Sequence, residues 1–93
     1  MNDVQAEELK AVFRENLVAL RKEKRLSQGQ LADILNKRRK RNEGKVHVPY
    51  LSALEQGTRS PTLETIAELA EALDTTPDAL LAPRISKKLA VSA

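Results

Sequence analysis

The fold of this 93-residue chain is decided by two short stretches, SQGQLADIL at residues 27–35 and VPYLSALEQG at residues 48–57. Ser27 and Gln30 have the spacing with which two side chains satisfy the free amides at the start of a helix. Pro49 is tolerated only in the first turn of a helix, and Gly57 can take the left-handed conformation that ends one. The sequence therefore predicts a helix over 27–35 and another over 48–56.

Three further helices are expected around these two. One runs from near Glu7 to Lys24, and a short last one follows Thr76 and Pro77. The apolar face of the first consists of Leu9, Val12, Phe13, Leu17 and Leu20. The fourth helix begins after an N-cap at Thr62. Its expected buried stripe is Leu63, Ile66, Ala67, Ala70 and Leu73. We therefore expect an all-α, five-helix domain over residues 9–82, between a flexible N-terminus (1–8) and a C-terminal tail (83–93).

The composition excludes several classes of function. Without cysteine, neither a disulfide framework nor a thiolate zinc site can form, and His47, the only histidine, has no second ligand beside it. Phe13 and Tyr50 are the only aromatic residues, too few for the stacking surfaces of single-strand binders. No nucleophile with a base, metal cluster or phosphate-binding glycine loop is present, so we expect neither an enzyme nor a cofactor. The longest apolar runs are far too short to span a membrane, so a cytoplasmic protein is expected.

The charge is distributed unevenly along the chain. The net charge is +3 overall, but it is +7 over residues 21–59, −5 over residues 60–83 and −2 over residues 1–20. A basic centre within an acidic frame suits a protein that presents one face to a polyanion, although a merely solvated basic surface would give the same count.

Two short helices in succession, with the second free to enter a major groove, form a helix-turn-helix arrangement. The chain resembles the Cro/C1 (XRE) family of phage repressors and bacterial regulators over roughly Phe13 to Leu81. The residues that carry the resemblance are Leu26, Ser27, Gln28, Leu31 and Ala32, then Leu51, Ser52, Leu54, Glu55 and Gly57, then Arg59, Ser60, Pro61, Leu63, Glu64 and Ile66. The resemblance implies a lambda-repressor-like domain that binds double-stranded DNA.

The same resemblance implies roles for individual residues. Gln28 corresponds to a glutamine that binds a DNA phosphate and stabilises the recognition helix; Tyr50 and His47 correspond to phosphate-contacting positions. Arg59 is placed to reach the DNA backbone, with an ordinary surface arginine as the alternative. The expected base-contacting surface of the recognition helix comprises His47, Val48, Pro49, Ser52, Ala53 and Gln56. This set is poor in side chains that make bidentate contacts to bases, so we expect thymine methyl groups, DNA shape or the preceding loop to supply specificity.

Two further residues are implied to act structurally. Arg21 and Glu55 resemble the family's internal ion pair between the first helix and the recognition helix. Arg25 stands where relatives commonly have the glycine that ends the first helix, so we expect an unfavourable backbone conformation there or a different helix end.

The connection between the two central helices departs from the family pattern. Residues 36–46, here called the basic insertion, replace a turn of about three to four residues. The cations of the basic insertion are Lys37, Arg38, Arg39, Lys40, Arg41 and Lys45. With one acid, Glu43, the net charge of the segment is +5. We expect this loop, or an extension of the preceding helix into it, to contact DNA phosphates or a minor groove, with a solvated disordered loop as the alternative.

These observations favour a transcriptional regulator, a repressor or autoregulator that binds a palindromic operator as a homodimer. Dimerisation is expected through the last helix and its surroundings, Pro77 to Ile85. An antitoxin with a toxin partner, a restriction-modification controller, and an adaptor whose basic loop binds RNA or an acidic protein remain as alternatives.

Overall fold

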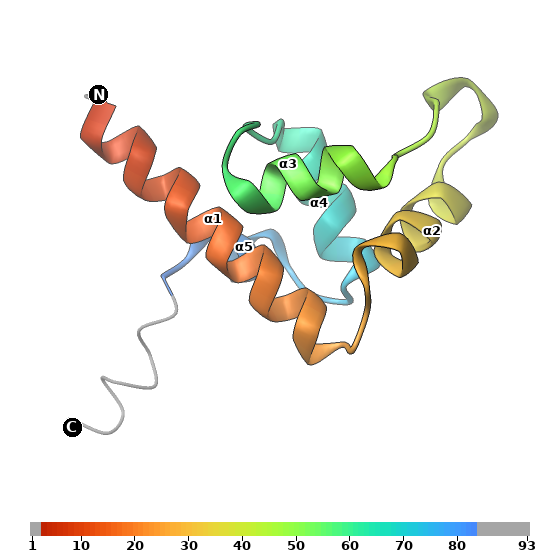
Figure 1. Ribbon diagram of the computed structural model, residues 1–93, viewed down its shortest axis with the longest axis horizontal. Coiled ribbons are helices and arrows are strands. Elements are labelled where there is room, and N and C mark those ends of the chain that lie inside the picture. The colour runs from red at the N-terminus through yellow and green to blue at the C-terminus, as the bar shows by residue number, and fades with distance from the viewer. Residues whose placement is uncertain (1–2, 84–93) are drawn as a thin grey trace.

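The computed structural model describes residues 3–83, and in that part of the chain every regular element is helical (Figure 1). The elements in order are α1 (Asp3–Glu23), α2 (Gln28–Arg38), the short 3₁₀ helix η1 (Arg41–Glu43), α3 (Val48–Gln56), α4 (Leu63–Ala72) and α5 (Pro77–Leu81). The expectation of an all-α, five-helix, lambda-repressor-like fold is confirmed. The expected tail from residue 84 onward, with part of the expected dimerisation segment, lies outside the described residues.

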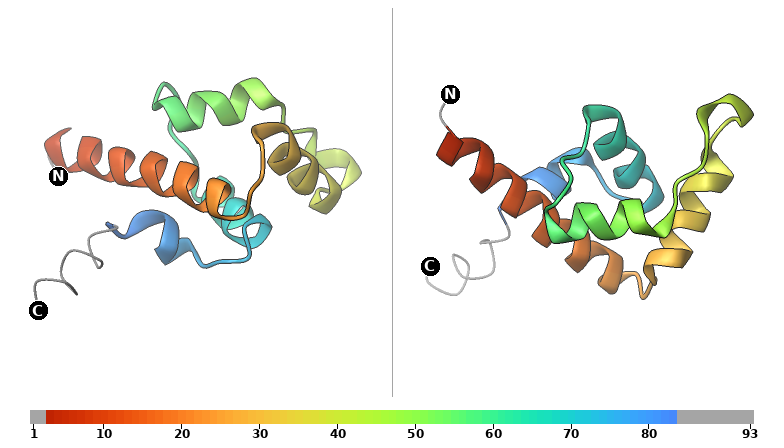
Figure 2. Two further views of the ribbon diagram at one scale, coloured as in Figure 1. Left: turned by 60° about the horizontal axis from the view of Figure 1, so that its bottom comes forward. Right: turned by 45° about the horizontal axis from the view of Figure 1, so that its top comes forward.

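Side chains from all five α-helices meet in a single core. Leu17, Leu31, Leu51, Leu69 and Leu80, one from each helix, have no exposed surface. Burying a leucine side chain contributes about 1.5–3 kcal/mol to the free energy of unfolding, so these five residues hold the short helices together. Figure 2 shows the result: α3 lies on one face of the domain, α5 lies on the opposite face, and α1 runs between them.

The first helix begins earlier than expected. The structure starts α1 at Asp3 rather than near Glu7, so residues 3–8, expected to be flexible, are helical. Its first turns consist of good helix formers, and Lys10 Nζ pairs with Glu7 Oε2 one turn away at 3.3 Å. Figure 1 shows that this end of α1 extends past the rest of the domain. Leu9, placed in the apolar face by sequence, is therefore 50% exposed.

A left-handed residue ends α1. Arg25 has φ 58°, and the two amides that follow the helix return to its last turn, Arg25 N to Lys22 O at 2.9 Å and Leu26 N to Arg21 O at 3.1 Å. The sequence therefore correctly indicated an unfavourable backbone at Arg25. Asp74, with φ 55°, closes α4 by the same pair of hydrogen bonds and was not anticipated.

The second helix, α2, extends further than its apolar residues predicted. Ser27 is its N-cap: Ser27 Oγ accepts from Gln30 N at 3.0 Å, and Ser27 N donates to Gln30 Oε1 at 2.8 Å. The helix then continues to Arg38 rather than ending at Leu35. The expectation of a loop over all of residues 36–46 is therefore wrong for its first three residues, and part of the remainder forms η1.

The remaining helices begin and end at the residues that the turn chemistry indicated. Pro49 lies in the first turn of α3, and Gly57, with φ 81°, ends it in the left-handed conformation. Thr62 Oγ1 accepts from Thr65 N at 3.1 Å at the start of α4. Thr76 precedes Pro77 at the start of α5. These caps fix where α3 and α4 start and stop, and therefore which of their faces meets the core.

The buried stripe of α4 differs from the predicted one. Leu63 is 80% exposed and Ala67 is also exposed, whereas Leu69 is fully buried. Leu63 is the first residue of α4, and Ala67 lies on its solvent-exposed side. The core face of α4 consists of Ile66, Leu69 and Ala70, and the buried Leu73 follows as its C-cap residue.

A buried asparagine joins the two ends of the domain. Asn16 on α1 is 1% exposed, and its Nδ2 donates to Leu80 O at 2.9 Å and to Ala82 O at 2.8 Å. Both carbonyls lie at the C-terminal end of α5, where helical carbonyls lack partners within the helix. Asn16 therefore stabilises a helix of only five residues by fixing its end to α1.

Candidate nucleic-acid interface

Helix α3 has one face in the core and one face in solvent. Leu51 and Leu54 are 0% and 1% exposed, whereas Val48 is 39% exposed. Pro49 and Gln56 are exposed as well, and Ser52 and Ala53 are half-buried between them. The outer face thus contains all the residues of α3 that the sequence assigned to base contacts. Ser52 and Gln56 are its polar side chains, and Gln56 Nε2 donates to Ser52 Oγ at 3.2 Å, which leaves the other donors and acceptors of both side chains free.

The inner side of α3 is fixed to α1 and α2 by Glu55. Arg21 Nε donates to Glu55 Oε2 at 2.6 Å and Arg21 Nη2 donates to Glu55 Oε1 at 2.9 Å, so the pair is bidentate. Arg21 Nη1 also donates to Leu26 O at 2.8 Å. A two-pronged, charge-assisted contact restricts rotation as well as separation of the two helices. The ion pair implied by the family resemblance is therefore present.

The protonation of Glu55 reflects this arrangement. Burial raises the pKa of Glu55, but the hydrogen bonds from Arg21 and Gln28 and the charge of Arg21 outweigh it and hold the pKa below its ordinary value. The pKa of Arg21 is raised, chiefly by its hydrogen bond to Glu55 and against the effect of burial. Both groups are therefore charged at neutral pH.

Gln28, at the first position of α2, is part of the same cluster. Its Nε2 donates to Glu55 Oε1 at 3.0 Å, which connects α2 directly to α3. An amide nitrogen has two hydrogens, so the second remains available to an acceptor such as a phosphate. The role in stabilising α3 is thus seen in the geometry, and the phosphate contact stays a prediction.

Tyr50 on α3 and Arg59 in the connection from α3 to α4 form the second group of expected backbone contacts. The hydroxyl oxygen of Tyr50 lies 3.1 Å from Thr65 Oγ1, so its direction is set by the start of α4. Arg59 Cζ lies 5.2 Å from the centre of the Tyr50 ring, within the range of a cation–π contact. Arg59 is therefore held at the surface beside α3, and it makes no ion pair with any carboxylate in residues 3–83.

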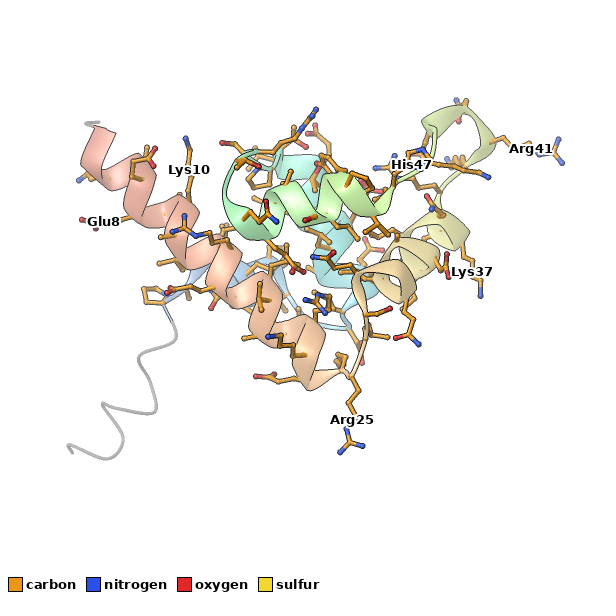
Figure 3. All side chains as sticks on the ribbon, in the orientation of Figure 1. Glu8, Lys10, Arg25, Lys37, Arg41 and His47 are labelled. Carbon is orange, nitrogen blue, oxygen red and sulfur yellow. The ribbon has the colours of Figure 1, made fainter. Side chains whose placement is uncertain are left out.

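His47 forms the N-cap position of α3 without capping it through its side chain. Its carbonyl accepts from Tyr50 N at 3.0 Å, while the imidazole is exposed. Figure 3 shows His47 where the basic insertion joins α3. The family's capping serine or threonine has no equivalent here, and the imidazole is available to an external acceptor.

The structure divides the cations of the basic insertion into two groups. Arg38 and Arg39 are paired with carboxylates of α4: Arg38 Nη2 lies 2.6 Å from Glu71 Oε2, and Arg39 Nη2 lies 2.8 Å from Glu68 Oε1. A cleft of about 480 Å³ lies between this segment and α4, and Arg38, Lys40, Glu68 and Glu71 are among the residues that line it. The other four cations are exposed and make no ion pair among the described residues: Lys37, Lys40, Arg41 and Lys45. The sequence alone did not separate these groups.

Two other kinds of site are not found in residues 3–83. No cluster of histidine and carboxylate side chains could hold a metal ion, and no helix is long and apolar enough to cross a membrane.

An exposed helix held against a second helix through a buried ion pair, with cations along its edges, defines a helix-turn-helix DNA-binding domain. A family model described as helix-turn-helix matches residues 17–80, more than half of the chain. The chain belongs to this Cro/C1-type (XRE) family of DNA-binding domains. Neither a curated protein nor a solved structure matches the chain.

Proposed function

We propose that the protein is a transcriptional regulator that binds a specific sequence of double-stranded DNA with α3 in the major groove. The observation that carries the proposal is the exposed outer face of α3 on a helix whose inner face is rigidly fixed by Leu51, Leu54 and Glu55. A recognition helix needs this combination, because its side chains must reach base edges from a defined position.

The contacts to bases would be mainly apolar. Val48, Pro49 and Ala53 are placed to pack against thymine methyl groups, and Ser52 and Gln56 supply the polar groups. Contacts to the DNA backbone would come from residues on both sides of this face: Gln28, His47, Tyr50 and Arg59. Sequence preference would then depend partly on methyl positions and on the shape of the groove.

We further propose that the protein acts as a homodimer on a palindromic operator and represses transcription by occupying it. One domain of this kind contacts few base pairs, and a second copy one helical turn away doubles the recognised sequence. A shallow groove of about 240 Å³ between the N-terminal half of α1 and the end of α5 is lined by Leu9, Val12, Leu81 and Pro83, among others. This groove lies on the part of the surface that the sequence favoured for dimerisation.

Selection from random double-stranded DNA tests the proposal. The expected result is a symmetric motif whose half-sites are about 34 Å apart, one turn of the duplex. Ala53→Glu should abolish selection, because it places a carboxylate on the outer face of α3 against DNA. Ala67→Glu, the same change on the exposed side of α4, is the matched control and should recover the wild-type motif. Binding that depends on DNA length but selects no motif would contradict the proposal and favour the adaptor function.

A further inference from the structure

The base of the basic insertion is closed by one side chain. Asn36 Nδ2 donates to Val46 O at 2.9 Å, and Asn36 Oδ1 accepts from Val46 N at 2.6 Å. The amide thus pairs with both backbone groups of Val46, as a neighbouring strand would. Val46 is 7% exposed and belongs to the core. Both ends of the intervening segment are therefore attached to the domain.

A second attachment lies just beyond α2. Arg39 Nε and Nη2 donate to the two carboxylate oxygens of Glu68 at 2.9 and 2.8 Å, and Arg39 Nη1 donates to Glu43 O at 3.0 Å. The guanidinium of Arg39 therefore connects the start of the insertion both to α4 and to Glu43, which lies later in the same insertion. The Arg39 side chain is 21% exposed, so this contact is partly shielded from water and less weakened by salt than a fully exposed pair.

The tip is folded as well. Lys40 N donates to Glu43 Oε1 at 2.6 Å, and Glu43 N donates to Lys40 O at 3.0 Å, which closes the turn that contains η1. Gly44 follows with φ 75°, a backbone conformation that residues other than glycine rarely adopt. The only acid of the insertion is thus used to order its backbone.

Two of the remaining cations point outward from this ordered frame, whereas Lys40, although exposed, lines the cleft beside the carboxylates of α4. Figure 3 shows Arg41 at the tip and Lys37 on α2, both directed away from the body of the domain. The right-hand view of Figure 2 shows the segment projecting beyond the N-terminal end of α3. Lys45 lies close to that end in sequence, two residues before His47.

We propose that the basic insertion is a pre-ordered arm that binds the phosphodiester backbone of duplex DNA beside the groove that holds α3, with its cations divided by function. Lys37, Arg41 and Lys45 contact phosphates, while Lys40 lies beside the carboxylates of the cleft. Asn36, Arg38 and Arg39 position the arm and do not contact DNA. The inference rests on the proposed function of α3, and it adds a second binding element with a phosphate ligand and no base preference.

The salt dependence of DNA affinity separates the two groups of cations. Each phosphate contact contributes about 0.9 to the slope of log affinity against log salt. The variant K37Q/R41Q/K45Q should therefore lose about 3 units of slope per protomer on the DNA selected by the wild type. The variant R38Q/R39Q should lose less than about 1 unit, although its affinity falls. Equal losses per cation removed in the two variants, or an unchanged slope in the triple variant, would overturn the proposal.

The positioning role of Asn36 has its own readout. In Asn36→Ala, the amide of Val46 should exchange with solvent faster, and DNA affinity should fall several-fold while the salt slope stays within about 1 unit of wild type. Asn36→Gln keeps a neutral amide donor and acceptor but displaces them by one methylene, so it should be intermediate and serves if the alanine variant does not fold. Unchanged exchange at Val46 together with unchanged affinity would contradict the role.

The two proposals fail in different ways. If the wild type selects no DNA motif, the proposed function fails and the arm fails with it. If the wild type selects a motif and the triple variant keeps its affinity and slope, only the arm fails. If the arm is correct, the triple variant should select the same base sequence as the wild type, because phosphate contacts carry no sequence information.

Discussion

The position of the recognition helix α3 depends strongly on one carboxylate, that of Glu55. It receives three hydrogen bonds, two from Arg21 and one from Gln28, and so connects α1, α2 and α3 at a single carboxylate. A variant that loses DNA binding on removal of Glu55 would therefore report on the position of α3 and not on a contact with DNA.

Replacing Glu55 by glutamine should lower the free energy of unfolding at pH 7 by about 1–3 kcal/mol, because Arg21 loses its partner in a partly buried position. The pKa of Glu55 is below its ordinary value of about 4.5 in the folded protein, so its contribution is complete above that value. It is lost as the pH falls toward the lower, folded-state pKa. The difference between wild type and E55Q should therefore begin to shrink as the pH falls below about 4.5 and should continue to shrink down to the folded-state pKa. Urea denaturation at stepped pH measures it.

Glu15→Gln is the control for this experiment, since Glu15 is exposed on α1. Its unfolding free energy should follow that of the wild type across the pH range. A gap between wild type and E55Q that stays constant down to pH 3 would show that the ion pair does not contribute through the charge of Glu55.

At the scale of the helices, the caps were predictable and the tertiary contacts were not. Ser27, Thr62 and Gly57 act through hydrogen bonds or backbone angles within a few residues, so the local sequence indicates them. The extension of α2 to Arg38 ends where Arg38 and Arg39 pair with carboxylates of α4 that lie about thirty residues away in sequence. No apolar periodicity accompanies such contacts, which is why the helix was expected to end at Leu35.

The same distinction holds for the site and the core. The outer face of α3 follows from helical spacing, and the structure exposes Val48, Pro49 and Gln56 as expected. Asn16 offered no local signal, because a single asparagine in a helix is ordinarily solvated and its partners belong to α5. The separation of the basic insertion into paired and free cations likewise depends on where α4 places Glu68 and Glu71.

The end of α1 allows a test of backbone strain. Arg25 adopts φ 58°, which costs a residue with a side chain about 1 kcal/mol relative to glycine. Arg25→Gly should therefore raise the free energy of unfolding by about 0.5–1 kcal/mol, measured by thermal or urea denaturation. Lys24→Gly, one residue earlier and without a positive φ, should instead lower it. A lower stability for R25G than for wild type would show that the arginine side chain makes a compensating contact.

At the scale of the whole molecule, the opposite faces carry the two proposed interactions. Figure 2 shows α3 on one face and α5 on the opposite face, and the groove is lined by residues of the N-terminal half of α1 and of the end of α5. Because these surfaces are separate, loss of dimerisation and loss of DNA contact can be produced by different substitutions.

Leu9→Glu is expected to separate the dimer into monomers without unfolding the domain, since Leu9 is half exposed and lines the groove. Sedimentation equilibrium should show the mass of one chain for this variant and of two chains for the wild type. Leu63→Glu is the matched control, because Leu63 is the most exposed leucine described and does not line the groove. A wild type that remains monomeric at micromolar concentration, or an L9E variant that remains dimeric, would contradict dimerisation through this surface.

The pairing of Asn36 with Val46 has a consequence for how such a protein can change over generations. Since both ends of the inserted segment are attached to the domain, residues 40–45 can be exchanged without moving α2, α3 or the core. Replacements at the tip would alter the overall strength of DNA binding and leave the preferred bases untouched, whereas replacements on α3 would alter the preferred bases. Under the proposed roles of α3 and the arm, mutation and selection would adjust how tightly an operator is held independently of which operator is chosen, a separation that a turn of ordinary length does not provide.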